Sequence, residues 1–469
     1  MDKYMIGRKI EKLIAVLVIA TFITGLLPGS ISNQVPSAKA AVPSVQAKAY
    51  VVMDANSGKV IYKKSMNKKI YPASTVKLMT AIVALENADL DKKITFTKKL
   101  RKMVPPDASK LGLKAGTTYS VRQYLNMMLI ASDADSATAL ASGTAGTYER
   151  FITLMNDTAR SYGMDKTSFD NPSGLDTGNG YTKTYTTAYD FAILARHAMS
   201  YEIIRNIVSK NTYNVPARKG KPSFKIKNTN GFYSTYKLKG KKYSIIGSKT
   251  GTTHAAGRVL IATARDESGH ELICAYFGGN TSDNLYNGIE KLLDYAYKQY
   301  SNGKTSLVAS FWDTRFRDSE SIICRHATSG IIPMTANGKF NPENIKNQVY
   351  TISLINNISG LGMEAGSGAA LTVADLAASY YNYINTQQEN NIEDNIPAEE
   401  THKEVPEGLS AEELAVTNTI DNVNSLGIQE QKQIAYLYLS GAMAGVNIKD
   451  ASHQLTKEEA VVIADLLAA

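Results

Sequence analysis

One apolar-periodic segment with a serine near its start constrains the fold of this 469-residue chain more than any other feature. Apolar residues recur at helical spacing through residues 72–86. Pro72 and Ser74 are residue types that are common where a helix begins. The segment therefore predicts a largely buried helix with a serine hydroxyl at its start.

Lys77 lies three residues after Ser74, so the two side chains share one face of the predicted helix. A serine becomes a good nucleophile when a neighbouring base takes its proton, and a lysine can be that base when burial or another cation lowers its pKa. The pattern Ser-x-x-Lys also begins at Ser65, Ser234 and Ser301, but among polar, Lys-rich or Gly-containing residues. From this pattern alone Ser74 is either a nucleophile or a helix cap, and Lys77 either a base or a surface residue.

Composition indicates an exported globular protein more than a nucleic-acid binder. Hydrophobic residues make up 43% and charged residues 20% of the chain, which suffices for a core, and the length allows two or three domains. The net charge is +9, of which residues 1–40 contribute part with five basic and two acidic residues. The mildly basic remainder suits an anionic surface such as a cell wall. The sequence has no dense Lys/Arg run interleaved with aromatic residues, so nucleic acid is not an expected partner.

Residues 1–40 are typical of a secretory signal peptide. A basic start precedes an apolar run over 13–27, and the small-residue site Ala38-Lys39-Ala40 follows. The alternative is an uncleaved membrane anchor, because the apolar run is close to the lower length limit for a span. Both interpretations place the rest of the chain at the extracellular face of the cell envelope, associated with the cell wall.

The periodic segments predict an α/β (α+β) fold with an antiparallel sheet flanked by helices. Strand-like runs occur at 49–53, 60–63, 243–246, 259–264 and 271–277. Helical patterns occur at 72–86, 121–130, 187–200 and 284–300, with another helix expected from Ser136. Strands at both ends, joined by short turns, need no crossover connection. Cys274 and Cys324 fall in different regions, so we expect both to be free and buried.

Three short motifs occur in one chain in a fixed order: Ser74-x-x-Lys77, Ser132-Asp133-Ala134 and Lys249-Thr250-Gly251. With them, residues 45–300 resemble the low-molecular-mass penicillin-binding proteins that are D-alanyl-D-alanine carboxypeptidases, serine peptidase family S11. The stretches 170–176 and 247–257 are also similar to stretches of that family. The resemblance implies a serine β-lactamase/transpeptidase-like domain.

The resemblance also implies roles for the motif residues. Ser74 attacks the carbonyl between two terminal D-alanines, Lys77 is the base, and Ser132 relays the proton to the leaving amine. The oxyanion is held by backbone N–H groups of Ser74 and Thr252. The expected substrate-binding residues are Lys249, Thr250, Gly251 and Thr252. The expected partners are peptidoglycan stem peptides and, as covalent inhibitors, β-lactams; neither a metal nor an organic cofactor is required.

One residue departs from the family pattern, whose second motif is Ser-x-Asn. Ala134 stands in place of the asparagine, which predicts slower acylation and keeps a non-catalytic wall-binding protein as an alternative. A class A β-lactamase is a further alternative, since Glu202 and Asn206 match its Glu-x-x-x-Asn motif. The apolar context of Glu202 favours an accidental match.

The last third of the chain predicts helical repeats. Segments that begin at Leu371, Leu409 and Leu455 each place Ser or Thr three residues before an acid, the signal of a capping box. Residues 305–386 and 407–469 resemble degenerate S-layer homology repeats, which implies binding to wall polysaccharide. An unrelated helical domain is the alternative. The polar, acidic residues 387–406 predict a linker between the two parts.

Overall fold

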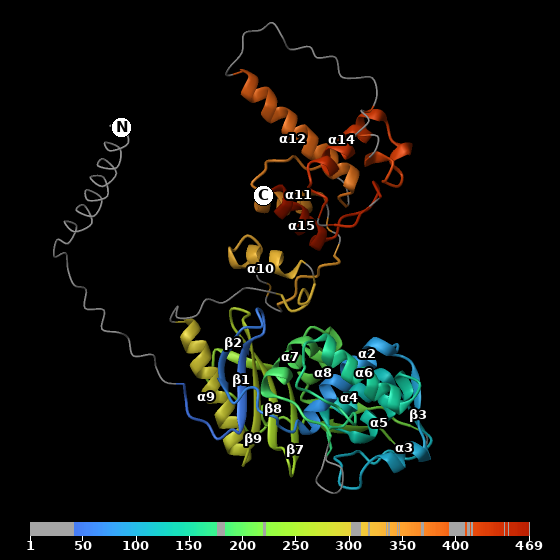
Figure 1. Ribbon diagram of the computed structural model, residues 1–469, viewed down its shortest axis with the longest axis vertical. Coiled ribbons are helices and arrows are strands. Elements are labelled where there is room, and N and C mark those ends of the chain that lie inside the picture. The colour runs from blue at the N-terminus through green and yellow to red at the C-terminus, as the bar shows by residue number, and fades with distance from the viewer. Residues whose placement is uncertain are drawn as a thin grey trace, which may run out of the picture. The chain divides into compact units, whose positions relative to one another are not determined.

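The central sheet of the computed structural model has five strands in the order β2-β1-β9-β8-β7, and each neighbouring pair is antiparallel (Figure 1). These strands are β1 (Ala49–Asp54), β2 (Val60–Lys64), β7 (Tyr243–Thr253), β8 (Gly257–Asp266) and β9 (Glu271–Gly279). The structure describes residues 42–175, 183–218, 222–301 and, with short gaps, 311–393 and 413–468. The predicted antiparallel sheet, built from the two ends of 45–300, is confirmed.

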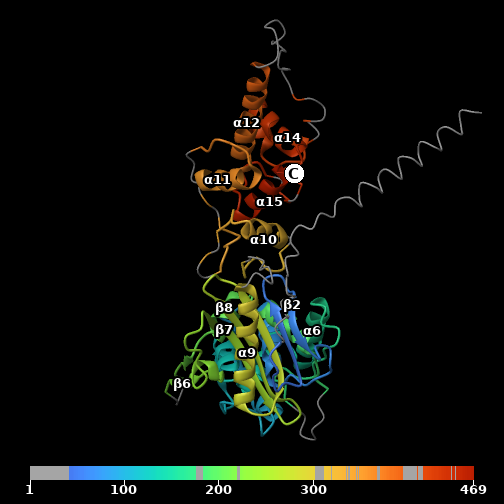
Figure 2. The ribbon, with the colours of Figure 1, turned by 90° about the vertical axis from the view of Figure 1, so that its left-hand side faces the viewer.

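Both faces of this sheet are covered by helices (Figures 1 and 2). Val51 and Met53 of β1 join one apolar cluster, whereas Tyr50 and Val52 join another, because alternate residues of a strand point to opposite faces. The second cluster includes one side of α9 (Ser282–Ser301), which Figure 2 shows in front of the sheet. The first cluster contains the helices that carry the motif residues.

The helices of the first cluster are α2 (Lys77–Asn87), α4 (Val121–Ile130), α5 (Ala134–Thr144), α6 (Tyr148–Ser161), α7 (Ala188–Ala198) and α8 (Glu202–Val208). Four of them, α2, α4, α5 and α7, lie in predicted helical segments, whereas α6 and α8 were not predicted. We expected the helix after α4 to begin at Ser136, but α5 begins two residues earlier, at Ala134. Asp133 is the cap residue, and its carboxylate accepts hydrogen bonds from the backbone N–H and the hydroxyl of Ser136, so that Ala134 is already helical.

The region from residue 311 onward has its own apolar cluster, and its named elements are helical in the described residues. They are α10 (Glu320–Thr328), α11 (Gln348–Ser359), α12 (Val373–Glu393), η3 (Val423–Ser425), α14 (Ile428–Leu439) and α15 (Lys457–Leu467). The acidic segment predicted as a linker from residue 387 therefore begins inside α12.

Two of the three predicted capping boxes are confirmed. Thr372 and Asp375 exchange hydrogen bonds before α12, and Thr456 and Glu459 do the same before α15. The two similar segments also lie side by side, because the backbone N–H of Leu455 donates to the carbonyl of Leu371 at 2.8 Å. The third box, at Ser410, and the predicted signal segment 1–40 lie outside the described residues.

Residues 311–317, which we call the strap, pack against the sheet-containing part of the chain. Arg315 donates to Glu271 of β9 at 2.8 Å and to the Asn56 side chain at 2.9 Å, and its own side chain is 0% exposed. Phe316 stacks on His197 of α7 with ring centroids 3.6 Å apart. The strap is therefore part of the folded core around the start of β9.

The described part of the chain has no membrane-spanning helix, no disulfide between its two cysteines and no metal-binding cluster. No helix there is both long enough and apolar enough to cross a membrane. Cys274 and Cys324 are buried and not joined to each other, as predicted. The described residues also contain no group of three or more His, Cys, Asp or Glu side chains that could hold a metal ion.

Candidate active site

Ser74 and Lys77 form a short, buried contact. Ser74 lies in the 3-10 turn η1 (Ala73–Val76), directly before α2 begins at Lys77. Lys77 Nζ lies 2.7 Å from Ser74 Oγ, and the two residues are only 1% and 8% exposed. Ser74 makes no capping hydrogen bond and Lys77 does not reach the surface, so the interpretation as a helix cap with a surface lysine is wrong.

Ser132 is presented by a strained turn between α4 and α5. Its φ is +59°, a left-handed conformation that is uncommon for a residue with a side chain. Ala73, next to Ser74, has a φ of +49°. Strained residues of this kind collect at functional sites, because the surrounding structure must hold them.

Lys249 of β7 reaches Ser132. Its Nζ donates to Ser132 Oγ at 2.9 Å and to the carbonyl of Thr250 at 2.9 Å, and Lys249 is 1% exposed. Thr250 Oγ1 in turn lies 2.6 Å from Thr229 Oγ1. No acidic side chain among the described residues pairs with Lys249, so its buried amine is available to an anionic group of a ligand.

Gly251 allows β7 to pass close to Ser74. A Cβ added at Gly251 would lie 3.0 Å from the backbone N of Ser74 and 3.1 Å from the carbonyl oxygen of Pro72. Any larger residue would therefore push the strand away from the serine. Thr252 follows Gly251 on the same strand and is exposed, opposite Arg258 of β8. The structure thus brings all seven predicted site residues to one region.

Burial is the main cause of the pKa shifts of the two lysines. It lowers the pKa of Lys77 to about 7, an effect that the nearby Asp133 carboxylate opposes. Burial, together with the charge of Lys77, also holds the pKa of Lys249 well below its usual range.

A third contact to Lys77 was not predicted from the sequence. The carbonyl oxygen of Ser173 accepts a 2.8 Å hydrogen bond from Lys77 Nζ. Asn171 shapes this turn, because its Oδ1 accepts hydrogen bonds from the backbone N–H of Ser173 at 3.1 Å and of Gly174 at 2.7 Å. Gly174, with φ +75°, passes so close to Ala73 that a Cβ there would overlap the Ala73 carbonyl. The only sequence signal was the resemblance of 170–176 to the family.

Neither neighbour of Ala134 replaces the missing amide. Ala134 is 1% exposed and only its backbone is polar; its N–H donates to the carbonyl of Ser109 at 2.9 Å. Asp133 Oδ1 and Asp135 Oδ2 accept hydrogen bonds from the backbone N–H groups of Leu111 and Leu113, each at 2.7 Å. Both carboxylates are therefore used to hold the loop over 104–116.

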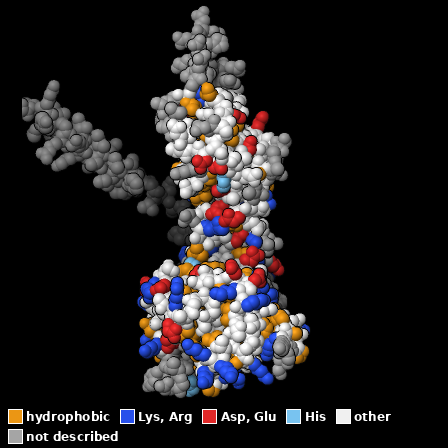
Figure 3. Space-filling view, turned by 90° about the vertical axis from the view of Figure 1, so that its right-hand side faces the viewer, with side chains coloured by type: hydrophobic (Ala, Val, Ile, Leu, Met, Phe, Trp, Pro, Cys, Tyr) orange, Lys and Arg blue, Asp and Glu red, His pale blue; other side chains and the backbone are white. Residues whose placement is uncertain are grey.

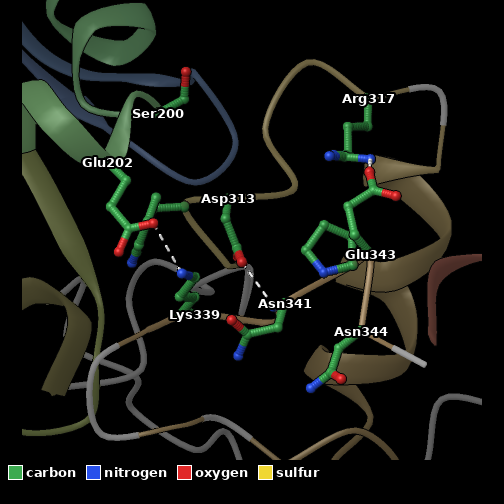
Figure 4. Close-up of a pocket in the computed structure, with 10 residues that line it drawn as sticks. Ser200, Glu202, Asp313, Arg317, Lys339, Asn341, Glu343 and Asn344 are labelled. Carbon is green, nitrogen blue, oxygen red and sulfur yellow. Dashed lines mark hydrogen bonds and ion pairs between the residues drawn. The ribbon is translucent and has the colours of Figure 1, made fainter. Parts of the chain in front are cut away.

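Glu202, the glutamate of the β-lactamase alternative, lies in a different place. It pairs with Lys339 at 2.9 Å and lines a pocket of about 490 Å³ together with residues of the strap and of 339–344 (Figure 4). Figure 4 shows its carboxylate directed at Lys339, and none of the seven predicted site residues lines this pocket. This arrangement gives Glu202 no role next to Ser74.

Comparison with known proteins agrees with this geometry. The family model described as D-alanyl-D-alanine carboxypeptidase, peptidase S11, matches residues 36–281, just over half of the chain. The D-alanyl-D-alanine carboxypeptidase DacF of Bacillus subtilis is 31% identical over 294 residues, which are 62% of this chain and 72% of DacF. DacA of Haemophilus influenzae is 30% identical over 273 residues, 56% of this chain and 65% of DacA.

A solved structure is also similar. The crystal structure of a D-alanyl-D-alanine carboxypeptidase from Mycobacterium tuberculosis H37Rv matches with a TM-score of 0.50 and 27% identity, over 56% of this chain and 95% of that one. The region that the family model matches contains all five strands of the central sheet and all three motifs. The chain therefore belongs to the peptidase S11 family of D-alanyl-D-alanine carboxypeptidases.

Proposed function

We propose that the protein is a serine-type D-Ala-D-Ala carboxypeptidase that removes the terminal D-alanine from peptidoglycan stem pentapeptides. The observation that carries the proposal is the pair of buried contacts, Lys77 with Ser74 and Lys249 with Ser132, around one strand edge. The first contact joins a nucleophile to a base with a lowered pKa. The second places the Lys249 amine where the substrate's terminal carboxylate can bind, and the negative charge of that carboxylate favours the protonated amine.

In the proposed reaction Ser74 Oγ attacks the carbonyl carbon of the penultimate D-alanine while its proton passes to Lys77. Backbone N–H groups of Ser74 and Thr252 stabilise the oxyanion. Collapse of the tetrahedral intermediate breaks the peptide bond, and the leaving amine takes a proton by way of Ser132. Water then hydrolyses the acyl-enzyme, which releases the shortened peptide and regenerates Ser74.

The proposed substrate contacts follow from the charges of the site. Lys249 and Thr250 bind the terminal carboxylate of the substrate, and Gly251 lets β7 lie beside the bound peptide. A β-lactam carries a carboxylate and a reactive carbonyl in similar positions, so it acylates Ser74 and inhibits the enzyme.

The test is the release of D-alanine from a soluble pentapeptide that ends in D-Ala-D-Ala, combined with labelling by a fluorescent penicillin. We expect both activities, and we expect Ser74→Ala to lose both. Absence of Ser74-dependent labelling would favour a non-catalytic wall-binding protein, which Ala134 keeps as the second candidate. Rapid hydrolysis of penicillin would favour a β-lactamase instead.

We further propose that residues 1–40 are a cleaved signal peptide and that residues 305–469 bind wall polysaccharide, with the enzyme at the outer face of the cell envelope. The two confirmed capping boxes support related helical units in this region, although they do not identify a ligand. Mass spectrometry of the mature N-terminus tests the first part. Binding of residues 305–469 to purified walls, provided that this part folds alone, tests the second.

A further inference from the structure

One of the strongly basic segments of the catalytic region lies beside the loop that contacts the Ser132 turn. Residues 92–114 contain eight Lys and Arg residues and one acidic residue, Asp107. All eight are exposed, and in the described part of the chain none of them forms an ion pair. We call these residues the basic surface: Lys92, Lys93, Lys98, Lys99, Arg101, Lys102, Lys110 and Lys114.

This charge works against local stability. Helix α3 (Lys98–Met103) has Lys98 and Lys99 in its first turn and no acid there, so the helix dipole disfavours both cations. Lys98 also faces Arg101 and Lys102 at the spacings i+3 and i+4, where like charges repel. Burial of Leu100 and the cap at Thr97 hold the helix in place. A feature that costs stability in this way is expected to serve a contact outside the fold.

The basic surface borders the candidate active site. The loop that follows α3 is fixed to the turn after Ser132, because the backbone N–H groups of Leu111 and Leu113 donate hydrogen bonds to the carboxylates of Asp133 and Asp135. Lys110 and Lys114 lie in this loop and flank those contacts. Figure 3 faces the side on which Figure 1 shows β3 (Lys93–Phe96) and α3, and it shows Lys and Arg side chains along the lower edge with few acidic ones among them.

The chemistry of the basic surface selects among anionic partners. Seven of its eight cations are lysines, which bind phosphates as point charges and need no fixed bidentate geometry. None of the large apolar side chains that are exposed in the described residues lies in 92–114, so insertion into a lipid surface has no support. Aromatic platforms for nucleic-acid bases are absent from it as well.

We propose that the basic surface binds a linear, phosphate-rich polymer carried by the cell wall and so holds the active site at wall that bears such polymers. The inference rests on the proposed function, because the polymer and the stem peptide are then parts of one wall. Binding of this kind is electrostatic and weakens as salt screens the charges.

The test uses the full chain with poly(glycerol phosphate) as the probe, at low and at physiological salt. The test variant replaces four residues of α3: Lys98→Gln, Lys99→Gln, Arg101→Gln and Lys102→Gln. The control variant removes the same charge elsewhere, from four exposed lysines around β2: Lys59→Gln, Lys63→Gln, Lys64→Gln and Lys68→Gln. We expect the α3 variant to lose at least about tenfold in affinity and the control to change less than about threefold.

Two further measurements separate the possible outcomes. D-alanine release from a soluble pentapeptide should be the same in both variants and in the unmodified protein, so failure of the proposed function would appear there and not in the polymer assay. Intact walls should retain the protein better than walls stripped of phosphate polymers, which keep the stem-peptide carboxylates. Equal loss in both variants, no polymer binding, or tighter binding to phosphatidylglycerol vesicles than to the polymer would each overturn the proposal.

Discussion

Lys77 Nζ lies 2.7 Å from Ser74 Oγ, and burial lowers the pKa of this lysine to about 7. Above that pH the amine is neutral and its lone pair can accept the proton of the serine hydroxyl. Below it the ammonium group can only donate. The same contact therefore changes from an inactive to an active arrangement near neutral pH.

The first prediction concerns this titration. The rate constant for acylation by a fluorescent penicillin should rise about tenfold per pH unit below about pH 7 and level off above it, because one proton must leave Lys77. Stopped-flow or quenched labelling over the pH range measures this. Lys77→Met should abolish labelling, and Ser74→Ala is the control for specificity. A rate that is constant between about pH 5 and about pH 8 would contradict the assignment of Lys77 as the base.

The second prediction concerns Asp133, whose carboxylate opposes the lowering of the Lys77 pKa. In Asp133→Asn that opposing charge is gone, so Lys77 should lose its proton more readily and the acidic limb of the pH profile should move to lower pH. The variant also loses an acceptor for the Ser136 hydrogen bonds, which should cost about 1–3 kcal/mol of folding free energy. The pH profile of acylation and thermal unfolding measure the two effects.

Asp135→Asn is the matched control for this shift. Asp135 also accepts a hydrogen bond from the loop over 104–116, but it is not among the charges that act on Lys77. It should lower stability without moving the pH profile. A profile that moves equally in both variants would show that the shift comes from loosening of the loop.

Sequence periodicity predicted the large elements well. Apolar spacing located α4 at its observed bounds, and it placed the strands around residues 49–64 and 243–277 in an antiparallel sheet. The motif order, combined with the family resemblance, identified residues that the fold brings together from distant parts of the chain. Burial patterns are local in sequence, and for that reason they can be read without the structure.

Features that depend on close approach of distant backbones were not predicted. No periodic pattern in the sequence indicates that the Ser173 carbonyl reaches Lys77 or that Ser132 adopts a positive φ. Arg315 is one arginine among many in the sequence, and its contact with Glu271 follows only from the folded strap. Such contacts carry no periodic pattern, so a single sequence holds no signal for them.

The third prediction concerns the missing amide. Ala134→Asn introduces the side chain that the family has at this position, so acylation by penicillin should become about ten- to a hundredfold faster. Ala134→Leu has similar bulk without the amide and should not be faster than the unmodified protein. Acylation rates of all three proteins measure the effect. If Ala134→Asn is properly folded but no faster, the site has adapted to alanine.

The fourth prediction concerns Asn171 as a positioning residue. In Asn171→Ala the turn that presents the Ser173 carbonyl loses its acceptor, so Lys77 loses a fixed partner. We expect kcat for the pentapeptide to fall about tenfold or more, with a smaller change in KM and an altered acidic limb of the pH profile. Asn171→Asp keeps an acceptor oxygen and should recover part of kcat. Loss of stability with an unchanged pH profile would indicate a purely structural role.

The fifth prediction concerns the strap. Glu271 is 3% exposed and pairs with Arg205, Arg265 and Arg315, which hold its pKa well below the ordinary value of 4.5. Arg315→Met removes one of these three partners and leaves two, so the free energy of unfolding should fall by about 2–3 kcal/mol at neutral pH. A carboxyl with a depressed pKa stabilises the fold above its unfolded pKa and loses this contribution as the pH falls through its folded pKa. The loss caused by Arg315→Met should therefore persist to acidic pH and shrink only where folded Glu271 takes up a proton.

Denaturant unfolding followed by the fluorescence of Trp312, the one tryptophan of the chain, measures this change within the strap. Arg317→Met is the matched control, since Arg317 is in the same strap but its side chain is 35% exposed where it pairs with Glu343 and Glu458. Exposed pairs contribute little, so this variant should lose less than about 1 kcal/mol. Equal losses in the two variants would show that the strap is held by its apolar contacts and not by Glu271.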